Sequence, residues 1–201
     1  MDFIELEKIS SIIFDPSDQL VEVSAANVPL QVSEASRVHV FRPQDGGEEH
    51  YAIEIGNPDR ENPVLSRLHS ACFTGDLIGS LKCDCGHQLR AALDAISSDG
   101  SGVLLYMNQE GRGIGLANKM RAYALQNQGF DTVEANHRLG FEDDERNFKL
   151  GAEILRLMGF ESVRLMTNNP AKVASMEAVG ITVFERVALK VGSNPLNETY
   201  L

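Results

Sequence analysis

Apolar and polar residues alternate in two stretches of the N-terminal third, and this two-residue period predicts β-strands. The stretches are residues 37–41 (RVHVF) and 51–56 (YAIEIG), separated by a loop rich in Gly, Asp and Glu. Residues 57–63 (NPDRENP) contain two prolines and indicate a surface turn. The longer apolar stretch over residues 64–73 (VLSRLHSACF) predicts a further strand.

From residue 87 onwards, the pattern becomes an alternation of helices and strands. Leu89, Leu93 and Ile96 share one helical face and predict a helix over 87–98, followed by Gly100. Similar patterns predict strands over 102–108, 163–169 and 181–189, and helices over 116–128 and 170–180. A further helix is expected to begin near Asp143, with acids in its first turn. Residues 109–115 would form a glycine-rich loop, and residues 191–201 would form another loop.

These elements predict an α/β fold of the α+β type, in which one mixed sheet is flanked by helices. The chain shows no internal repeat, low-complexity segment or clear linker, so we expect a single domain over residues 1–201. Residues 1–62 would form its strand-rich N-terminal part. Residues 63–200 carry the candidate chemistry.

The charge balance narrows the classes of partner. The net charge is −11 and the pI is about 4.9, whereas a general nucleic-acid binder usually carries a basic face, so we expect no nucleic-acid partner. No apolar run reaches the roughly 18–20 residues of a membrane span, and the N-terminal residues MDFIELEKISS lack the pattern of a signal peptide. We therefore expect a cytoplasmic protein without a membrane partner. An acidic chain can still bind one phosphorylated molecule where its few cations converge.

All three cysteines of the chain lie within fourteen residues, at Cys72, Cys83 and Cys85. Zinc binds thiolates readily, and three protein ligands leave one position for water, as in catalytic sites. A structural site would need a fourth ligand, for which His69 and His87 are near in sequence. Two alternatives remain: cysteines are often small buried apolar residues, and a redox role is weakened by the absence of C-x-x-C. The spacing favours zinc.

Five segments of the chain resemble the GTP cyclohydrolase II family, and the resemblance extends from about Pro63 to Tyr200. They are RLHSACFTGDLIGSLKCDCGHQL (67–89), QEGRGIGL (109–116), NKMRAYALQNQGFDTVEANHRLGF (118–141), DDERNF (143–148) and TNNPAKV (167–173). The resemblance implies an enzyme that opens the imidazole ring of GTP and releases formate and pyrophosphate. The product would be 2,5-diamino-6-(5-phosphoribosylamino)pyrimidin-4(3H)-one, made in the first step of riboflavin biosynthesis. The resemblance also implies that the protein binds Zn²⁺, that Mg²⁺ accompanies the GTP phosphates, and that the protein is a homodimer.

The resemblance assigns roles to individual residues. The zinc ligands would be Cys72, Cys83 and Cys85, with a water completing the site. Arg146 would attack the α-phosphorus and Asp144 would orient it or accept its proton, although the two residues alone would be read as an ordinary surface pair. Tyr123 would support ring hydrolysis, although a tyrosine on an amphipathic helix is more often part of the core. GTP contacts would fall on Arg67, Leu68, His69, Ser70, Ala71, Gln88, Glu110, Gly111, Arg112, Thr132, Thr167 and Lys172.

Two positions depart from the family pattern, and they leave alternatives open. Many members have a glutamate at the position of Ala71, and often an arginine at that of Asn108. A related enzyme that makes another ring-opened product, or a regulator that binds nucleotide without turnover, therefore remain alternatives. The intact cysteines and the Asp144–Arg146 pair argue against the regulator.

Overall fold

The computed structural model describes residues 20–44, 46–195 and 197 of the 201-residue chain. Within this part the strands are β1 (Leu20–Asn27), β2 (Ser36–Pro43), β3 (His50–Ile55), β4 (Val64–Ser70), β5 (Gly102–Met107), β6 (Ser162–Met166) and β7 (Thr182–Val187). The helices are the π-helix η2 (Phe73–Leu77), α1 (Cys85–Asp99), the 3₁₀-helix η3 (Glu110–Gly113), α2 (Gly115–Gln126), α3 (Thr132–Arg138), α4 (Lys149–Leu157) and α5 (Pro170–Ala178).

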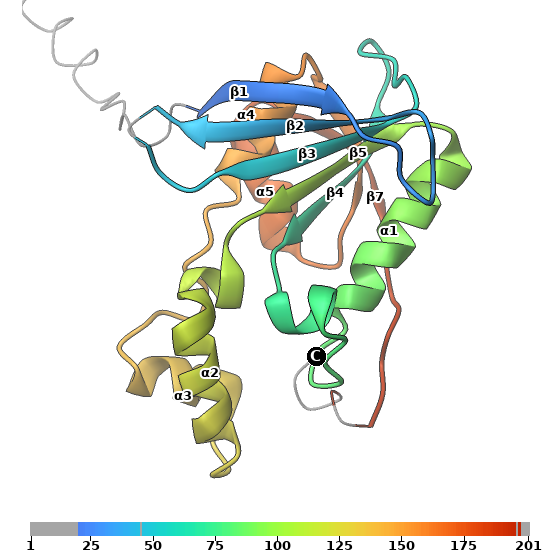
Figure 1. Ribbon diagram of the computed structural model, residues 1–201. Helices are drawn as coiled ribbons and strands as arrows, with labels where there is room; N and C mark the ends of the chain where they lie inside the picture. Colours follow the sequence, from blue (N-terminus) through green and yellow to red (C-terminus); the bar gives the residue numbers. More distant parts are fainter. Residues whose placement is uncertain (1–19, 45, 196, 198–201) are drawn as a thin grey trace, which may run out of the picture.

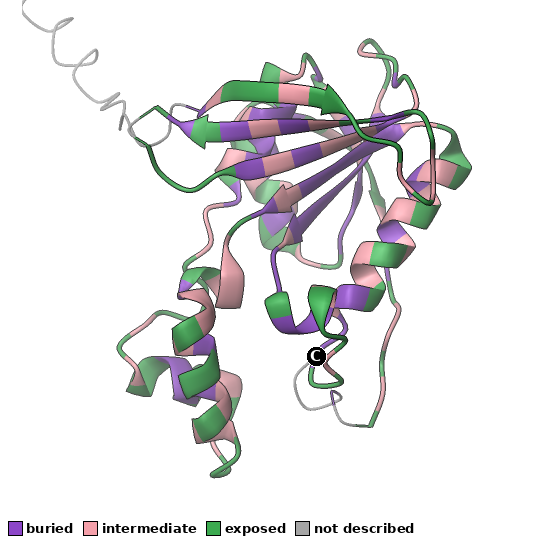
Figure 2. Ribbon diagram, viewed as in Figure 1, coloured by how far each residue is buried: buried purple, intermediate pink, exposed green. Residues whose placement is uncertain are grey.

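The strands form one mixed sheet in the order β1-β2-β3-β5-β4-β6-β7 (Figure 1). The first four strands of this order pair antiparallel, and β5, β4, β6 and β7 pair parallel. Six of the seven residues of β4 are buried, as expected for a parallel strand that helices cover on both faces. The edge strands β1 and β7 are mostly exposed (Figure 2).

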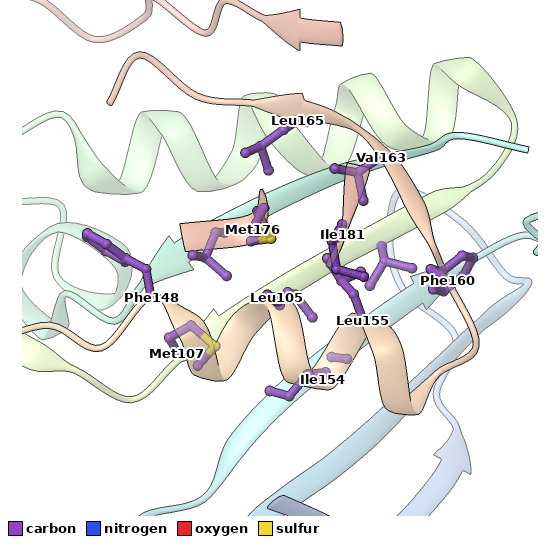
Figure 3. Packing of buried hydrophobic residues seen from close by; sticks show 14 of the residues in the cluster. Leu105, Met107, Phe148, Ile154, Leu155, Phe160, Val163, Leu165, Met176 and Ile181 are labelled. Carbon is purple, nitrogen blue, oxygen red and sulfur yellow. The ribbon is translucent and has the colours of Figure 1, made fainter. Parts of the chain in front are cut away.

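Helices cover both faces of the parallel half. Helix α1 lies on one face, and α4 and α5 lie on the other (Figure 1). Leu104 and Leu105 of β5 are neighbours in sequence but belong to opposite cores, because successive side chains of a strand face opposite ways. Leu105 packs with Leu155 and Phe160 on the α4 side (Figure 3), and each such fully buried side chain contributes about 1.5–3 kcal/mol to folding.

The predicted fold class, a mixed sheet with flanking helices and a strand-rich N-terminal part, is confirmed. The strand expected over 64–73 ends at Ser70, because the chain then turns into η2. The helix expected near Asp143 is wrong: α4 begins only at Lys149. The Asp144 carboxylate accepts a hydrogen bond from the backbone N–H of Arg146 (3.1 Å), a local turn that competes with the helix.

Four described elements have no counterpart in the sequence predictions: β1, α3 and the short helices η2 and η3. Helix α3 begins with a capping box, in which Asp131 and Glu134 bond to each other's backbone N–H groups. The predicted strand-rich part before residue 20 lies outside the described residues.

The topology brings together the carboxyl ends of three parallel strands, β4, β5 and β6, and the line of these strand ends is the edge of the sheet meant below. The connection from β4 to β5 runs through α1 on one face, and the return from β5 to β6 runs through α4 on the other. Such a reversal opens a crevice at the carboxyl ends of parallel strands. Residues that follow β4, β5 and β6 therefore meet there, and α2 and α3 extend beyond this edge (Figure 1). Among the described helices, none has the length and apolar composition that crossing a bilayer requires.

Candidate active site

The three thiols meet at this edge of the sheet. Their sulfur atoms lie within 4.8 Å of one another, and the Cys72 and Cys83 sulfurs are 3.7 Å apart. Cys72 follows β4 and caps η2, where its sulfur accepts a hydrogen bond from the N–H of Gly75 (3.3 Å). Cys85 is the first residue of α1. The fold thus converts the C-x10-C-x-C spacing into one compact cluster.

The cluster has the donor set and the size that zinc requires. Four thiolates at about 2.3 Å in a tetrahedron stand about 3.8 Å apart, close to the separation of Cys72 and Cys83. Gly75 leaves room for the sulfurs, because a Cβ there would lie 2.8 Å from the Cys83 sulfur and 3.1 Å from that of Cys72. Within the described residues no fourth ligand joins the three thiols, so a zinc ion held there would keep one coordination position for water.

The thiols also differ in acidity. Hydrogen bonds from Cys83 and Cys85, assisted by the ammonium group of Lys119, lower the pKa of Cys72 well below its ordinary value. Hydrogen bonding to Cys72 in turn raises the pKa of Cys83 and of Cys85, and burial and the negative charge of Cys72 add to this effect. A bound dication would remove this repulsion and let all three ionise.

Asp76 holds the cysteine loop in place. Its carboxylate accepts hydrogen bonds from the backbone N–H of Cys72 (3.0 Å) and the hydroxyl of Tyr106 (2.9 Å), and lies 3.0 Å from Nε2 of His69. The sequence analysis overlooked Asp76, although it lies inside the cysteine segment. The predicted contact residue His69 is almost fully buried in this network.

A cavity of about 330 Å³ opens beside the thiols. Twelve of the eighteen residues predicted for the site line it: Arg67, Ser70, Ala71, Cys72, Cys85, Gln88, Glu110, Gly111, Arg112, Arg146, Thr167 and Lys172. Asp84, Gln109, Lys119, Asn168 and Asn169 complete the wall. The structure therefore brings together residues from segments 100 positions apart in the chain.

Two buried cations line the cavity without a carboxylate hydrogen-bonded to them. The Lys172 ammonium donates to the carbonyl of Leu68 (2.7 Å), and burial, aided by the charges of Arg67 and Arg146, lowers its pKa to about 7. The Arg67 guanidinium donates to the carbonyl of Met166 (2.8 Å) and to the side chain of Gln88. Burial lowers the pKa of Arg67 as well. Buried cations to which none of the described carboxylates is hydrogen-bonded favour an anionic ligand.

Arg146 and Asp144 form a two-pronged pair on the loop before α4. Arg146 Nε and Nη2 donate to the two oxygens of Asp144 at 2.7 and 2.5 Å, while Nη1 lies 3.3 Å from the hydroxyl of Ser70. Partial burial opposes the charge of Asp144, but its hydrogen bonds to Arg146 lower its pKa overall. The Arg146 side chain is only 16% exposed, so the pair is more enclosed than a typical surface ion pair.

The glycine-rich loop is held against the arginine loop. Gly111 and Arg112 both have φ near +60°, which for arginine is a strained backbone conformation of the kind that gathers at functional sites. The Arg112 carbonyl accepts a hydrogen bond from the N–H of Glu145 (2.9 Å). Gly113 packs so tightly there that a Cβ would lie 2.9 Å from the backbone of Glu145.

The remaining predicted residues do not line the cavity. Cys83 belongs to the thiol cluster, Leu68 is a core residue of β4, and Asp144 acts through Arg146. The buried hydroxyl of Tyr123 has no hydrogen-bond partner among the described residues, and burial raises its pKa. Thr132 begins α3, where its hydroxyl accepts from Gln126 (3.1 Å).

Comparisons with known proteins agree on one family. A sequence model of the family "GTP cyclohydrolase II" matches residues 21–188. A protein of Azospirillum brasilense named GTP cyclohydrolase-2 is 57% identical over 90% of this chain, which spans 47% of that protein. Proteins of the same name from Enterobacter sp. and Salmonella typhimurium are 53% and 52% identical, with 91% of this chain and 93% of theirs covered.

Proposed function

The chain belongs to the GTP cyclohydrolase II family, and we propose that it is a zinc-dependent hydrolase that opens the imidazole ring of GTP. It releases C8 as formate and the two outer phosphates as pyrophosphate. The remaining product is 2,5-diamino-6-(5-phosphoribosylamino)pyrimidin-4(3H)-one, formed in the first step of riboflavin biosynthesis. One observation carries the proposal: Cys72 and Cys85 of the thiol cluster and Arg146, which Asp144 holds, line a single cavity.

The triphosphate binds at the cationic end of the cavity. Arg67 and Lys172 are buried there, and Arg112 adds a third positive charge. Charged hydrogen bonds from such groups to phosphate oxygens are about twice as strong as neutral ones. Mg²⁺ accompanies the phosphates, since it prefers oxygen ligands and one or two phosphate groups.

Arg146 cleaves the substrate at the α-phosphorus. Asp144 engages Nε and Nη2, so Nη1, which lies beside Ser70, is the nitrogen free to attack. A bond forms between this nitrogen and phosphorus, the bond to the β-phosphate oxygen breaks, and pyrophosphate leaves with the electron pair. Arginine is a poor nucleophile while protonated, so Asp144 takes one proton from Nε or Nη2. The neutral guanidine shares its electron density with Nη1, and it becomes a cation again once the nitrogen–phosphorus bond has formed. Water later hydrolyses the nitrogen–phosphorus bond.

The thiol cluster serves the other half of the reaction. Zinc held by Cys72, Cys83 and Cys85 supplies Lewis acidity and an activated water at neutral pH, which attack at C8 requires. Tyr123 orients the base, since its buried hydroxyl lacks a partner within the described residues. Gln88 bonds Arg67 and so links α1 to the phosphate end of the cavity.

We further propose a cytoplasmic location, as the sequence pattern predicts, and a homodimer, as the family resemblance implies. The test of the function is a product assay. Zinc-loaded protein is incubated with GTP and Mg²⁺, and formate and pyrophosphate are measured, with ATP as the control nucleotide. Equal amounts of formate and pyrophosphate from GTP, with neither product from ATP, support the proposal. Tight GTP binding without either product would instead identify a regulator.

A further inference from the structure

Lys119 of α2 connects the metal cluster to the glycine-rich loop. Its ammonium nitrogen lies 3.0 Å from the sulfur of Cys72 and 2.8 Å from Oε1 of Glu110. The other oxygen of Glu110 accepts a hydrogen bond from the N–H of Phe73 (2.6 Å). Three segments, η2, η3 and α2, are therefore joined through one lysine and one glutamate.

This lysine is buried to a degree that requires a charged partner. Its side chain is 7% exposed and that of Glu110 is 13% exposed. Burial opposes the positive charge, but hydrogen bonds to Cys72 and Glu110 raise the pKa of Lys119 above its ordinary value. A buried ammonium without partners would be strongly unfavourable, so these contacts define where the side chain can lie.

The local backbone lets the Lys119 side chain reach both of its partners, Cys72 and Glu110. A Cβ at Gly111 would lie 3.0 Å from the Cβ of Lys119, so the glycine lets the loop approach α2 closely. The Gly111 N–H also donates to Oε1 of Glu110 (2.9 Å). Three donors, the N–H groups of Phe73 and Gly111 and the ammonium group of Lys119, thus hold the Glu110 carboxylate. These hydrogen bonds prevent the carboxylate from rotating freely toward the cavity.

We propose that Lys119 is a positioning residue that holds the Cys72 sulfur as a metal ligand and the Glu110 carboxylate at the cavity wall. The inference rests on the proposed zinc site and adds a residue outside the three ligands. Partners that bond to metal ligands orient them, and their loss typically weakens metal binding 10–100-fold. The N–H···S bond also withdraws electron density from the Cys72 sulfur.

Metal affinity tests the proposal independently of turnover. Zinc dissociation constants are measured by chelator competition for the wild type, Lys119→Met and Lys119→Gln. We expect Lys119→Met to bind zinc 10–100-fold more weakly, and Lys119→Gln to lose less because its amide keeps an N–H donor. Arg121→Met is the matched control: Arg121 is exposed on the same helix and, within the described part of the chain, bonds to Asn118 of that helix only. It should change the affinity less than twofold.

The cobalt-substituted protein gives a second signal that a merely structural lysine would not produce. In Lys119→Met the sulfur-to-cobalt charge-transfer band should move to longer wavelength, because the thiolate has lost a hydrogen-bond donor. Unchanged zinc affinity and an unchanged band in a folded Lys119→Met protein would overturn the proposal. If that variant does not fold, Lys119→Gln decides by affinity alone: its uncharged amide should still weaken zinc binding more than Arg121→Met does, and an affinity equal to that control would overturn the proposal. A wild type that retains no zinc would contradict the proposed function itself.

Discussion

The ionisation of Lys172 should control how tightly the triphosphate binds. The ammonium is buried, its hydrogen-bond acceptor is the carbonyl of Leu68, and its pKa of about 7 reflects burial first and then the charges of Arg67 and Arg146. The charges of Asp144 and Cys85 act in the opposite direction and raise the pKa of Lys172. The centre of the Phe148 ring lies 5.3 Å from Nζ of Lys172. In the empty site, the lysine is therefore about half protonated at neutral pH.

A bound triphosphate favours the charged lysine, so binding takes up a proton. Above pH 7 the free site loses that proton, and the apparent dissociation constant should rise about tenfold per pH unit, or about 1.36 kcal/mol. Between pH 7.5 and 9 this amounts to roughly 30-fold. The phosphate groups of a triphosphate ester are already ionised across this window, since the last pKa of an esterified phosphate is about 6.

Inhibition by an alkyl ester of triphosphate, such as methyl triphosphate, between pH 7.5 and 9 measures the effect without the base. Lys172→Arg stays charged throughout and should bind with an affinity that hardly depends on pH. Calorimetry in buffers of different ionisation enthalpy should show proton uptake by the wild type at pH 8. A wild-type affinity that is constant over the window, or equal slopes in both proteins, would refute the reasoning.

Three further predictions concern the two chemical centres. Cys85→Ser should lose most of its zinc, because a soft thiolate is replaced by a hydroxyl; metal analysis that finds one zinc per chain would reject this ligand. Gly75→Ala should weaken zinc binding in a chelator titration, since its Cβ would crowd the Cys83 sulfur at 2.8 Å. Arg146→Lys should lower kcat by more than about 10³-fold, as loss of a nucleophile does, while Arg156→Lys, which alters an exposed pair with Glu153, should not. A lysine variant at 146 that keeps its kcat and only raises KM would identify a phosphate clamp instead.

Sequence patterns predicted the parallel half of the fold well, because its signals are local. Strands such as β5 are continuous apolar runs, and α5 starts with Pro170 at its first position. The helix expected near Asp143 is wrong because acidic residues are typical of two structures: the first turn of a helix, and a turn in which the carboxylate bonds to a nearby backbone N–H. Here Asp144 bonds the N–H and the guanidinium of Arg146 instead.

The site could be predicted only where a motif was recognisable. The cysteine spacing indicated a metal cluster by itself. The Asp144–Arg146 pair did not stand out from ordinary surface pairs, and the resemblance alone selected it. Lys119 and Asp76 were not predicted, because the partners that define them come from other segments: Lys119 bonds a sulfur 47 residues away. Such long-range contacts leave no periodic signal in the sequence.

The release of both products by three proteins tests the central claim most directly, namely that two centres act on one GTP molecule in one cavity. Formate and pyrophosphate are quantified together for the zinc-loaded wild type, Cys85→Ser and Arg146→Ala. We expect one formate per pyrophosphate from the wild type, pyrophosphate without formate from Cys85→Ser, and neither product from Arg146→Ala. Formate release by Arg146→Ala at the wild-type rate would contradict the account, because ring opening would then not depend on the arginine.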